Sequence, residues 1–536
     1  MINSVQYGAK PSYLTLPKLG TAAEITLLFI AMFLFSGGLL SQLLGDDAST
    51  QGSPFLRALF YPVYLLTLLL LVLRPWSTVH GIGRSFLLLI PVGLALASVS
   101  WSIDPDPTLR RAVALLMTTM FAIYIATRFD WPEFIELFAA GFLILAVLSL
   151  IVALIMPDIG IMSEIHPGAW SGIYWEKNQF GMNMAKLAHL CLCAMIFKPS
   201  RRLFWGGAFL LAVMLVLLST SKTSLIALML ILSGMGGLYL VRKGPVIAIP
   251  LTYFAMVFGV GLVMALQFFP EFMFGLIGRE PTLTGRTDIW AALFDQIRNR
   301  PWFGHGYAIF WMDETGPAFW VRQRTEWLVP TAHNGWLETW LSIGLVGVIC
   351  FALVYATALI SALRNLLKGK MAYWALISTL VFLLFSMSES NILQQNNLGW
   401  ILFAATAAKL FGARPLAFGS KYRRPVEFGF KPAKPQHLAQ ALGGPVGYFG
   451  PSLTLESPME DRQSTEYKGL RQANRHPIGH TNQAAMLPRG LRRPLAKSKG
   501  FDQVVAQGGP VRRNFLINQG VSSPSKHRPI LLNTRK

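Results

Sequence analysis

Charged residues are scarce in this chain of 536 residues, making up 14% of it, whereas a typical soluble domain carries about 25%. Hydrophobic residues make up 53%, and the mean hydropathy is +0.46. This composition excludes an ordinary soluble globular protein and predicts a polytopic membrane protein. Cysteine is nearly absent as well. The three cysteines all lie in apolar runs, so neither a disulfide framework nor a cysteine-based metal site is predicted.

Acidic residues are also few, 26 against 47 basic ones, which gives a formal net charge of +21. Such a charge raises the question of nucleic-acid binding, but its distribution argues against that partner. From residue 421 onward, 20 Lys and Arg stand against 6 Asp and Glu, so +14 of the +21 belongs to the last segment. This segment is rich in Pro, Gly and Gln and has no apolar periodicity. We therefore expect residues 413–536 to form a basic, disordered cytoplasmic tail that either touches anionic lipid or has no specific partner.

Charge-poor apolar runs recur along the rest of the chain, and about 20 apolar residues are enough to cross the hydrocarbon core of a bilayer. We expect an all-α polytopic fold with about twelve transmembrane helices and no cleaved signal peptide. These helices would join a cytoplasmic N-terminus at 1–24 to a transmembrane domain at 25–412. The predicted spans lie near residues 25–44, 58–73, 85–103, 112–127, 137–156, 180–197, 203–219, 223–241, 246–268, 335–360, 372–388 and 394–412.

The distribution of Lys and Arg between the short loops predicts the orientation of these helices. With the N-terminus inside, the short inner loops hold 11 basic residues and the short outer loops hold 5. This orientation also puts the basic tail inside. It leaves residues 269–333 outside as the one large outer loop of the predicted topology.

The large outer loop contains the segment TGRTDIWAALFDQIRNRPWFGHGY, residues 284–307. Thr284 or Thr287 can cap the start of a helix there, and Pro301 follows its end. The sequence therefore predicts an amphipathic helix on the outer membrane surface or packed over the spans. A helix that only packs, without touching a substrate, is the alternative. The apolar residues recur at helical spacing, namely Ile289, Trp290, Leu293, Phe294 and Ile297.

Two residues of this loop are candidates for substrate binding and proton transfer. Arg286 stands at the start of the predicted helix, where unpaired N–H groups and an arginine fork together suit a phosphate or pyrophosphate. Its alternative role is a salt bridge with Asp288 or Glu280. His333 lies where the chain re-enters the membrane, in TAHNGWLETWLSIGLVG, and can move a proton near neutral pH. Its alternative role is an interfacial hydrogen bond.

Further polar residues are predicted on the outer face, where positive charge runs against the usual membrane trend and so suggests a bound anion. Each could instead form a salt bridge, most readily Lys177 with Glu176. Lys186 and His189 lie deeper in the sixth span and are expected to face the protein interior, because a charge in lipid is costly. The outer candidates come from WSIDPDPTLRR, WEKNQFG, STSKTS and SESNILQQNN, and are Arg110, Lys177, Asn178, Lys222 and Glu389.

These motifs resemble one known family. GRTDIW followed by PWFGHGY and HNGWLETWLSIGLVG, with WSIDPDPTLRRA, WEKNQFG and STSKTS in order and spacing, looks like the O-antigen ligase and polymerase (Wzy- and WaaL-like) superfamily over about residues 90–400. The chain is most similar to exopolysaccharide polymerisation proteins of the ExoQ type. The resemblance implies a GT-C-like membrane glycosyltransferase that needs no metal or other cofactor. It implies a donor glycan on undecaprenyl pyrophosphate, used at the periplasmic face of the bacterial inner membrane.

The resemblance also assigns roles to residues. Arg286 matches the family arginine that contacts pyrophosphate, and His333 matches the histidine that assists the acceptor hydroxyl; Arg110, Lys177 and Lys222 match further positions. We expect an enzyme that polymerises lipid-linked repeat units into exopolysaccharide, beside a flippase and a chain-length co-polymerase. The alternatives are an O-antigen ligase or protein oligosaccharyltransferase with the same donor, and a flippase of lipid-linked oligosaccharide. A flippase usually shows repeated halves and short loops on both sides, which this sequence does not.

Overall fold

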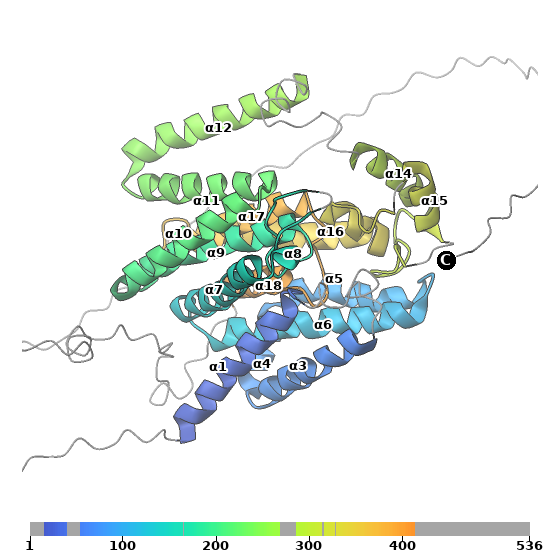
Figure 1. Ribbon diagram of the computed structural model, residues 1–536, viewed down its shortest axis with the longest axis horizontal. Helices are drawn as coiled ribbons and strands as arrows, with labels where there is room; N and C mark the ends of the chain where they lie inside the picture. The colour runs from blue at the N-terminus through green and yellow to red at the C-terminus, as the bar shows by residue number, and fades with distance from the viewer. Residues whose placement is uncertain are drawn as a thin grey trace, which may run out of the picture. The chain divides into compact units, whose positions relative to one another are not determined.

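The computed structural model describes residues 16–39, 54–163, 166–268, 286–312, 316–326 and 328–412, which form α-helices and short 3₁₀ turns joined by loops (Figure 1). Over these ranges there is no β-strand, and one isolated bridge joins Ile161 to Trp170. The all-α prediction is therefore confirmed for this part of the chain. The predicted basic tail, residues 413–536, lies outside the described residues, as does the chain before residue 16.

The helices follow the predicted spans closely. Each predicted span overlaps one helix, and α14 and α15 lie between the ninth and tenth spans. The elements are α1 (Leu16–Phe35), α3 (Pro54–Val72), α4 (Pro75–Arg84), α5 (Phe86–Ala97), η2 (Ser98–Ser100), α6 (Pro105–Arg128), α7 (Trp131–Ile155), α8 (Pro157–Gly160), α9 (Lys177–Phe197), η3 (Pro199–Arg201), α10 (Arg202–Leu218), α11 (Lys222–Val241), α12 (Pro245–Phe268), α14 (Arg286–Asn299), α15 (Pro317–Thr325), α16 (Gly335–Arg364), α17 (Ala372–Ser386) and α18 (Leu398–Leu410).

Six helices of the described part are long and apolar enough to cross a membrane, or seven if the pair 58–72 and 75–84, bent by 102°, forms one broken span. The six are α6, α7, α9, α10 with η3, α11 and α16. This agrees with a polytopic membrane protein, while the count of twelve spans stays a prediction. Several helices are shorter than the predicted spans, and polar residues stand at their first or last turns. For example, the Asn397 side chain accepts the Trp400 N–H and starts α18 at Leu398, four residues after the predicted start of the span at 394.

Helix α9 packs between α7, α10 and α11. Small residues allow this close approach, as expected for helices in a membrane. At Gly181, a β-carbon would lie 2.6 Å from the hydroxyl oxygen of Ser224 and 2.7 Å from that of Ser219. The start of α9 is thus held tightly against the turn that joins α10 to α11.

Helix α16 is broken inside the candidate span. Ile343 (φ −129°, ψ 17°) and Gly344 (φ 72°, ψ −175°) leave helical geometry. The loop 301–306, PWFGHG, fills the break and supplies the missing hydrogen-bond partners. Burial lowers the pKa of His305 in this loop to about 4, so its imidazole is neutral at physiological pH. The main-chain bonds run from His305 N to Leu341 O (2.8 Å), Gly306 N to Ser342 O (3.0 Å), Leu345 N to Pro301 O (2.9 Å) and Val346 N to Trp302 O (3.2 Å).

Gly344→Ala is expected to destabilise the fold. A β-carbon there would lie 2.1 Å from the Trp302 carbonyl oxygen, in a backbone conformation that essentially only glycine adopts. The conformational strain alone costs about 1–3 kcal/mol, so the thermal midpoint and the membrane level of the protein should both fall. Gly236→Ala in α11 is the matched control, since a β-carbon at Gly236 meets nothing within 4 Å. Equal midpoints for the two variants would contradict this account of the break.

The amphipathic helix predicted in the outer loop is confirmed as α14, which packs against α15 and α16 (Figure 1). Ile289, Leu293 and Ile297 are buried on its inner face, while Phe294 stays 43% exposed. The indole N–H of Trp290 donates to the Ala332 carbonyl at 3.0 Å. This bond ties α14 to the residue before His333, so packing of the helix helps to hold the C-terminal end of the loop.

Candidate active site

Arg286, His333 and Glu389, separated by up to 103 residues in the sequence, meet in the structure. Nη2 of Arg286 lies 3.5 Å from Oε1 of Glu389, and Nδ1 of His333 lies 3.4 Å from Oε2 of the same carboxylate. Their side chains are 13–18% exposed, so they are accessible but largely shielded from water. We call these three residues the Glu389 cluster. Such a shielded arrangement makes each charge–charge contact stronger than on an open surface.

Each member of the cluster stands at the end of a helix. Arg286 begins α14. His333 directly precedes Asn334, the N-cap of α16, whose side chain accepts the N–H groups of Trp336 and Leu337. Glu389 follows α17, and its backbone N–H donates to Phe385 O at 2.9 Å. Three separate helices therefore aim one side chain each at a common point.

His333 adopts a left-handed backbone conformation, with φ of 47°. This conformation is uncommon outside glycine, though His, Asn and Asp tolerate it better than most residues. The backbone N–H of His333 donates to the Thr331 hydroxyl at 3.4 Å, which helps to hold the turn. Strained positions of this kind concentrate at functional sites.

Glu176, the N-cap residue of α9, faces the same cluster. Burial raises the pKa of Glu176, and the nearby negative charge of Glu389 raises it further, while His333 and Arg286 act in the opposite direction. The sequence suggested Glu176 only as a partner for Lys177. The structure instead makes it a second carboxyl group beside the Glu389 cluster, with a raised affinity for a proton.

Glu176→Gln is expected to remove a pH-dependent loss of stability. The raised pKa means that the folded protein keeps this proton where the unfolded chain has lost it, so the free energy of unfolding falls as pH rises from about 4.3 through the raised pKa. Below about pH 4.3 Glu176 is protonated in both the folded and the unfolded state, so none of this free energy of unfolding is lost. Glutamine stays neutral, so the variant should have the higher thermal midpoint at neutral pH, with the difference vanishing at low pH.

The measurement is the thermal midpoint of the purified protein in detergent across the acidic to neutral range. Glu326→Gln is the control, because Glu326 is exposed after α15. Parallel curves for Glu176→Gln and the wild type would show that Glu176 is not held in this environment.

Lys177, Asn178 and Lys222 come together where α9 and α11 begin. Nζ of Lys177 lies 3.5 Å from the hydroxyl oxygen of Thr220, and the Ser221 hydroxyl donates to Oδ1 of Asn178 at 3.0 Å. Lys222 is the first residue of α11, directly after Ser221. The motifs WEKNQFG and STSKTS therefore form one polar corner next to Glu176.

Arg110 is not brought to the cluster. It is exposed on α6, whereas its neighbour Arg111 is buried and donates from Nη1 to the Ala308 carbonyl. Helical spacing could have separated the two, because Arg111 shares a face with the buried Thr108 and Leu115. The inward arginine of α6 thus holds the loop 301–312 instead of an anion.

Glu338, in the first turn of α16, organises the loops on both sides of the cluster. Its carboxylate accepts the indole N–H of Trp311 (2.9 Å to Oε1), the backbone N–H of Ala332 (2.9 Å) and the hydroxyl of Ser390 (3.2 Å). Ala332 precedes His333 and Ser390 follows Glu389. One half-buried carboxylate therefore fixes the spacing between two members of the Glu389 cluster.

A cavity of about 570 Å³ opens beside Glu338, at the break in α16. Its polar wall includes Thr331, Gln394 and Gln395, and its aromatic wall includes Trp311. This cavity could not be predicted from the sequence, because its walls come from four segments that meet only in the folded chain.

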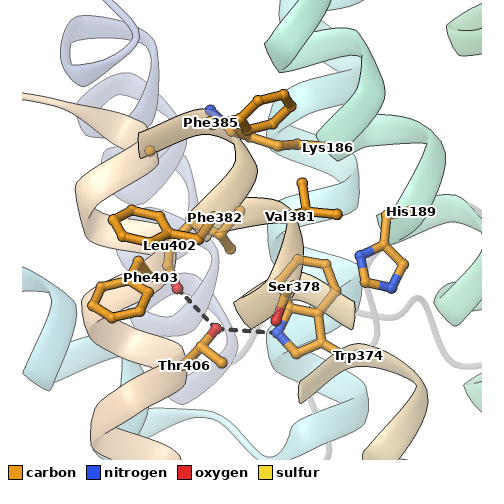
Figure 2. A pocket seen from close by; sticks show the side chains of 11 residues that line it. Lys186, His189, Trp374, Ser378, Val381, Phe382, Phe385, Leu402, Phe403 and Thr406 are labelled. Carbon is orange, nitrogen blue, oxygen red and sulfur yellow. Dashed lines mark hydrogen bonds between the residues drawn. The ribbon is translucent and has the colours of Figure 1, made fainter. Parts of the chain in front are cut away.

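Lys186 and His189 face the protein interior, as predicted, and line a second cavity of about 440 Å³ between α9, α17 and α18 (Figure 2). Lys186 Nζ donates to Asn183 Oδ1 at 3.2 Å and lies 5.5 Å from the Phe385 ring centroid. The His189 ring stacks on Trp374 with a centroid distance of 4.7 Å. Both groups are therefore shielded from lipid by protein.

No group of three His, Cys, Asp or Glu side chains suited to a metal ion is found in the described part of the chain. The chemical resources of the candidate site are then one guanidinium, one imidazole and two carboxyl groups. This set can bind an anion through the arginine and move a proton through the histidine.

Two comparisons with known proteins bear on these residues. Residues 207–352 match the family described as O-antigen ligase, a stretch that contains both Arg286 and His333. The exopolysaccharide production protein ExoQ of Rhizobium meliloti (strain 1021) is 26% identical over 362 residues, which cover 63% of this chain and 80% of that protein.

Proposed function

From the confirmed resemblance of this chain to the O-antigen ligase and polymerase superfamily, we propose that it is a membrane glycosyltransferase of exopolysaccharide production. Both comparisons support a ligase- or polymerase-type function in exopolysaccharide production. We further propose that the protein joins oligosaccharide repeat units carried on undecaprenyl pyrophosphate. The observation that carries it is the Glu389 cluster, which pairs an anion-binding arginine with a proton-accepting histidine.

Arg286 would bind the pyrophosphate of the donor. Its planar fork matches phosphate oxygens, and the N-terminus of α14 adds unpaired N–H groups and a positive dipole end. As the bond between the sugar and the pyrophosphate breaks, negative charge grows on the leaving oxygen. A guanidinium already in place stabilises that charge without reorganisation.

His333 would act as the general base. With Nδ1–H donated to the Glu389 carboxylate, Nε2 is the basic nitrogen of the ring. The acceptor hydroxyl oxygen forms a bond to the anomeric carbon, its proton passes to Nε2, and the polyprenyl pyrophosphate leaves with the electron pair of the broken C–O bond. Glu389 positions both His333 and Arg286 and stabilises the imidazolium.

A direct displacement of this kind inverts the anomeric centre. We therefore expect the new linkage in the polymer to have the anomeric configuration opposite to that of the lipid-linked repeat. NMR of the repeat unit before and after polymerisation measures both configurations. Retention would contradict a single displacement and would call for a covalent intermediate.

The proposal includes the location of the protein in the cell. Arg286, His333, Glu389 and Glu176 all come from segments that the charge distribution predicts on the outer side of the membrane. We propose a multi-pass protein of the bacterial inner membrane whose active face is periplasmic, acting without a cofactor. A flippase that delivers the lipid-linked repeat and a chain-length co-polymerase are its proposed partners.

A ligase is the second candidate, because the matching family is described as O-antigen ligase. The test is the glycan found on the extracted polyprenyl lipid in a deletion strain. Single repeats facing the periplasm, with no polymer, would support a polymerase. Long chains stranded on the lipid would support a ligase, and single repeats trapped on the cytoplasmic face would reject both in favour of a flippase.

A further inference from the structure

We infer that the cavity of about 570 Å³ beside Glu338 binds a sugar ring of the acceptor glycan, with Trp311 as its aromatic wall and Gln394 as a polar contact. This inference rests on the proposed function, since it names the acceptor subsite of that reaction. This volume includes the open solvent space at the mouth of the cavity.

The aromatic wall is rigid. The Trp311 indole N–H donates to both oxygens of Glu338, at 2.9 and 3.1 Å, and the Trp311 ring packs edge-on against Phe310 at a centroid distance of 4.9 Å. A fixed ring loses no rotamer entropy when a ligand arrives. Its electron-rich face attracts the weakly positive C–H groups that one face of a sugar ring presents.

The polar wall suits a neutral ligand with many hydroxyl groups. Amide and hydroxyl side chains can both donate and accept, as sugar hydroxyls require. Oε1 of Gln395 accepts the Tyr307 hydroxyl at 2.7 Å, which fixes that amide, whereas Gln394 makes no side-chain hydrogen bond to the described residues and is available to a ligand. Thr331 and Ser390 add hydroxyl groups to the same lining.

The charge of the lining distinguishes this cavity from the pyrophosphate site. Its described lining residues include Glu338 but no Lys or Arg, so an anionic phosphate would find no cationic side chain among them. The Glu338 carboxylate is engaged with Trp311, Ala332 and Ser390 and serves to position the walls. The cavity therefore fits the sugar and not the lipid phosphate.

The cavity also adjoins the reacting groups. Thr331 of its lining accepts the His333 backbone N–H, and Ser390 of its lining follows Glu389 in the chain. A sugar held against Trp311 would thus present a hydroxyl toward His333, while Arg286 holds the donor on the other side of Glu389. This division gives donor and acceptor separate supports around one carboxylate.

The test is direct binding of the repeat-unit oligosaccharide, released by mild acid from the lipid-linked repeat and titrated into the purified full-length protein by calorimetry. We expect Gln394→Ala and Trp311→Ala to weaken binding about tenfold, which corresponds to about 1.4 kcal/mol. Gln323→Ala and Trp320→Ala are matched controls, because both side chains are exposed on α15.

Thermal midpoints show whether each variant still folds. If Trp311→Ala proves unstable, Gln394→Ala alone tests the subsite. Wild-type affinity in both cavity variants, with polymer still formed by the wild type, would overturn the subsite and leave the proposed function standing. Sugar binding that depends on Gln394, in a protein that makes no polymer from lipid-linked repeats, would uphold the carbohydrate site and reject the polymerase.

Discussion

Replacing Arg286 by alanine is expected to lower the rate of polymer formation about 10²–10³-fold, because one preorganised donor to the leaving group is lost. Arg286 is 17% exposed and its Nη2 lies 3.5 Å from the Glu389 carboxylate, so its guanidinium is already in position before a donor arrives. The rate would be measured as polymer formed from lipid-linked repeats by the purified protein in liposomes. The level of protein in the membrane should not change.

Two variants sharpen this test. Arg298→Ala removes another arginine of α14, one that is 78% exposed and paired with Asp295, and should leave the rate unchanged. Arg286→Lys keeps the charge but not the fork and should give an intermediate rate. Near-normal polymer from Arg286→Ala would remove this residue from the site.

Replacing His333 by asparagine is expected to lower the rate about 10²–10⁴-fold, the usual contribution of a general base. Asparagine is chosen because position 333 has a φ of 47°, which asparagine tolerates well. Its side-chain N–H₂ can still donate to Glu389, but it offers no basic nitrogen at the position of Nε2. The fold and the contact with Glu389 should therefore survive while proton transfer is lost.

The thermal midpoint of His333→Asn should match that of the wild type, which separates a chemical effect from unfolding. His80→Asn on α4 controls for the general effect of this substitution. Full activity in His333→Asn would reduce His333 to an interfacial hydrogen-bonding residue.

Much of the fold could be predicted from the sequence because membrane helices depend on local composition. Charge-poor runs coincide with helices, and the helical spacing of the apolar residues from Ile289 to Ile297, before Pro301, predicted α14. The break in α16 could not be predicted in this way. It exists because the loop 301–306 supplies hydrogen-bond partners from 36 or 44 residues earlier in the chain, and an isolated Gly344 gives no sign of that loop.

The candidate site, too, could be predicted only in part. Arg286, His333 and Glu389 were predicted one by one from charges at helix starts, but their common contact depends on the packing of α14 over α16. The prediction of Arg110 overlooked the helical spacing, which puts its neighbour Arg111 on the buried face of α6. Trp311 and Gln394 gave no signal, since a cavity has no local pattern in the chain.

The loop seated in the break of α16 limits how substrates reach the reacting groups. Lifting this loop would expose four main-chain hydrogen bonds between residues 301–306 and 341–346. Each buried polar group left unpaired costs about 1–3 kcal/mol, so opening this seam is costly. Under the proposed function, we therefore expect the donor lipid and the acceptor glycan to approach past α14 and α15, whose packing rests mainly on side chains. The break in α16 would then make one side of the Glu389 cluster harder to open than the other.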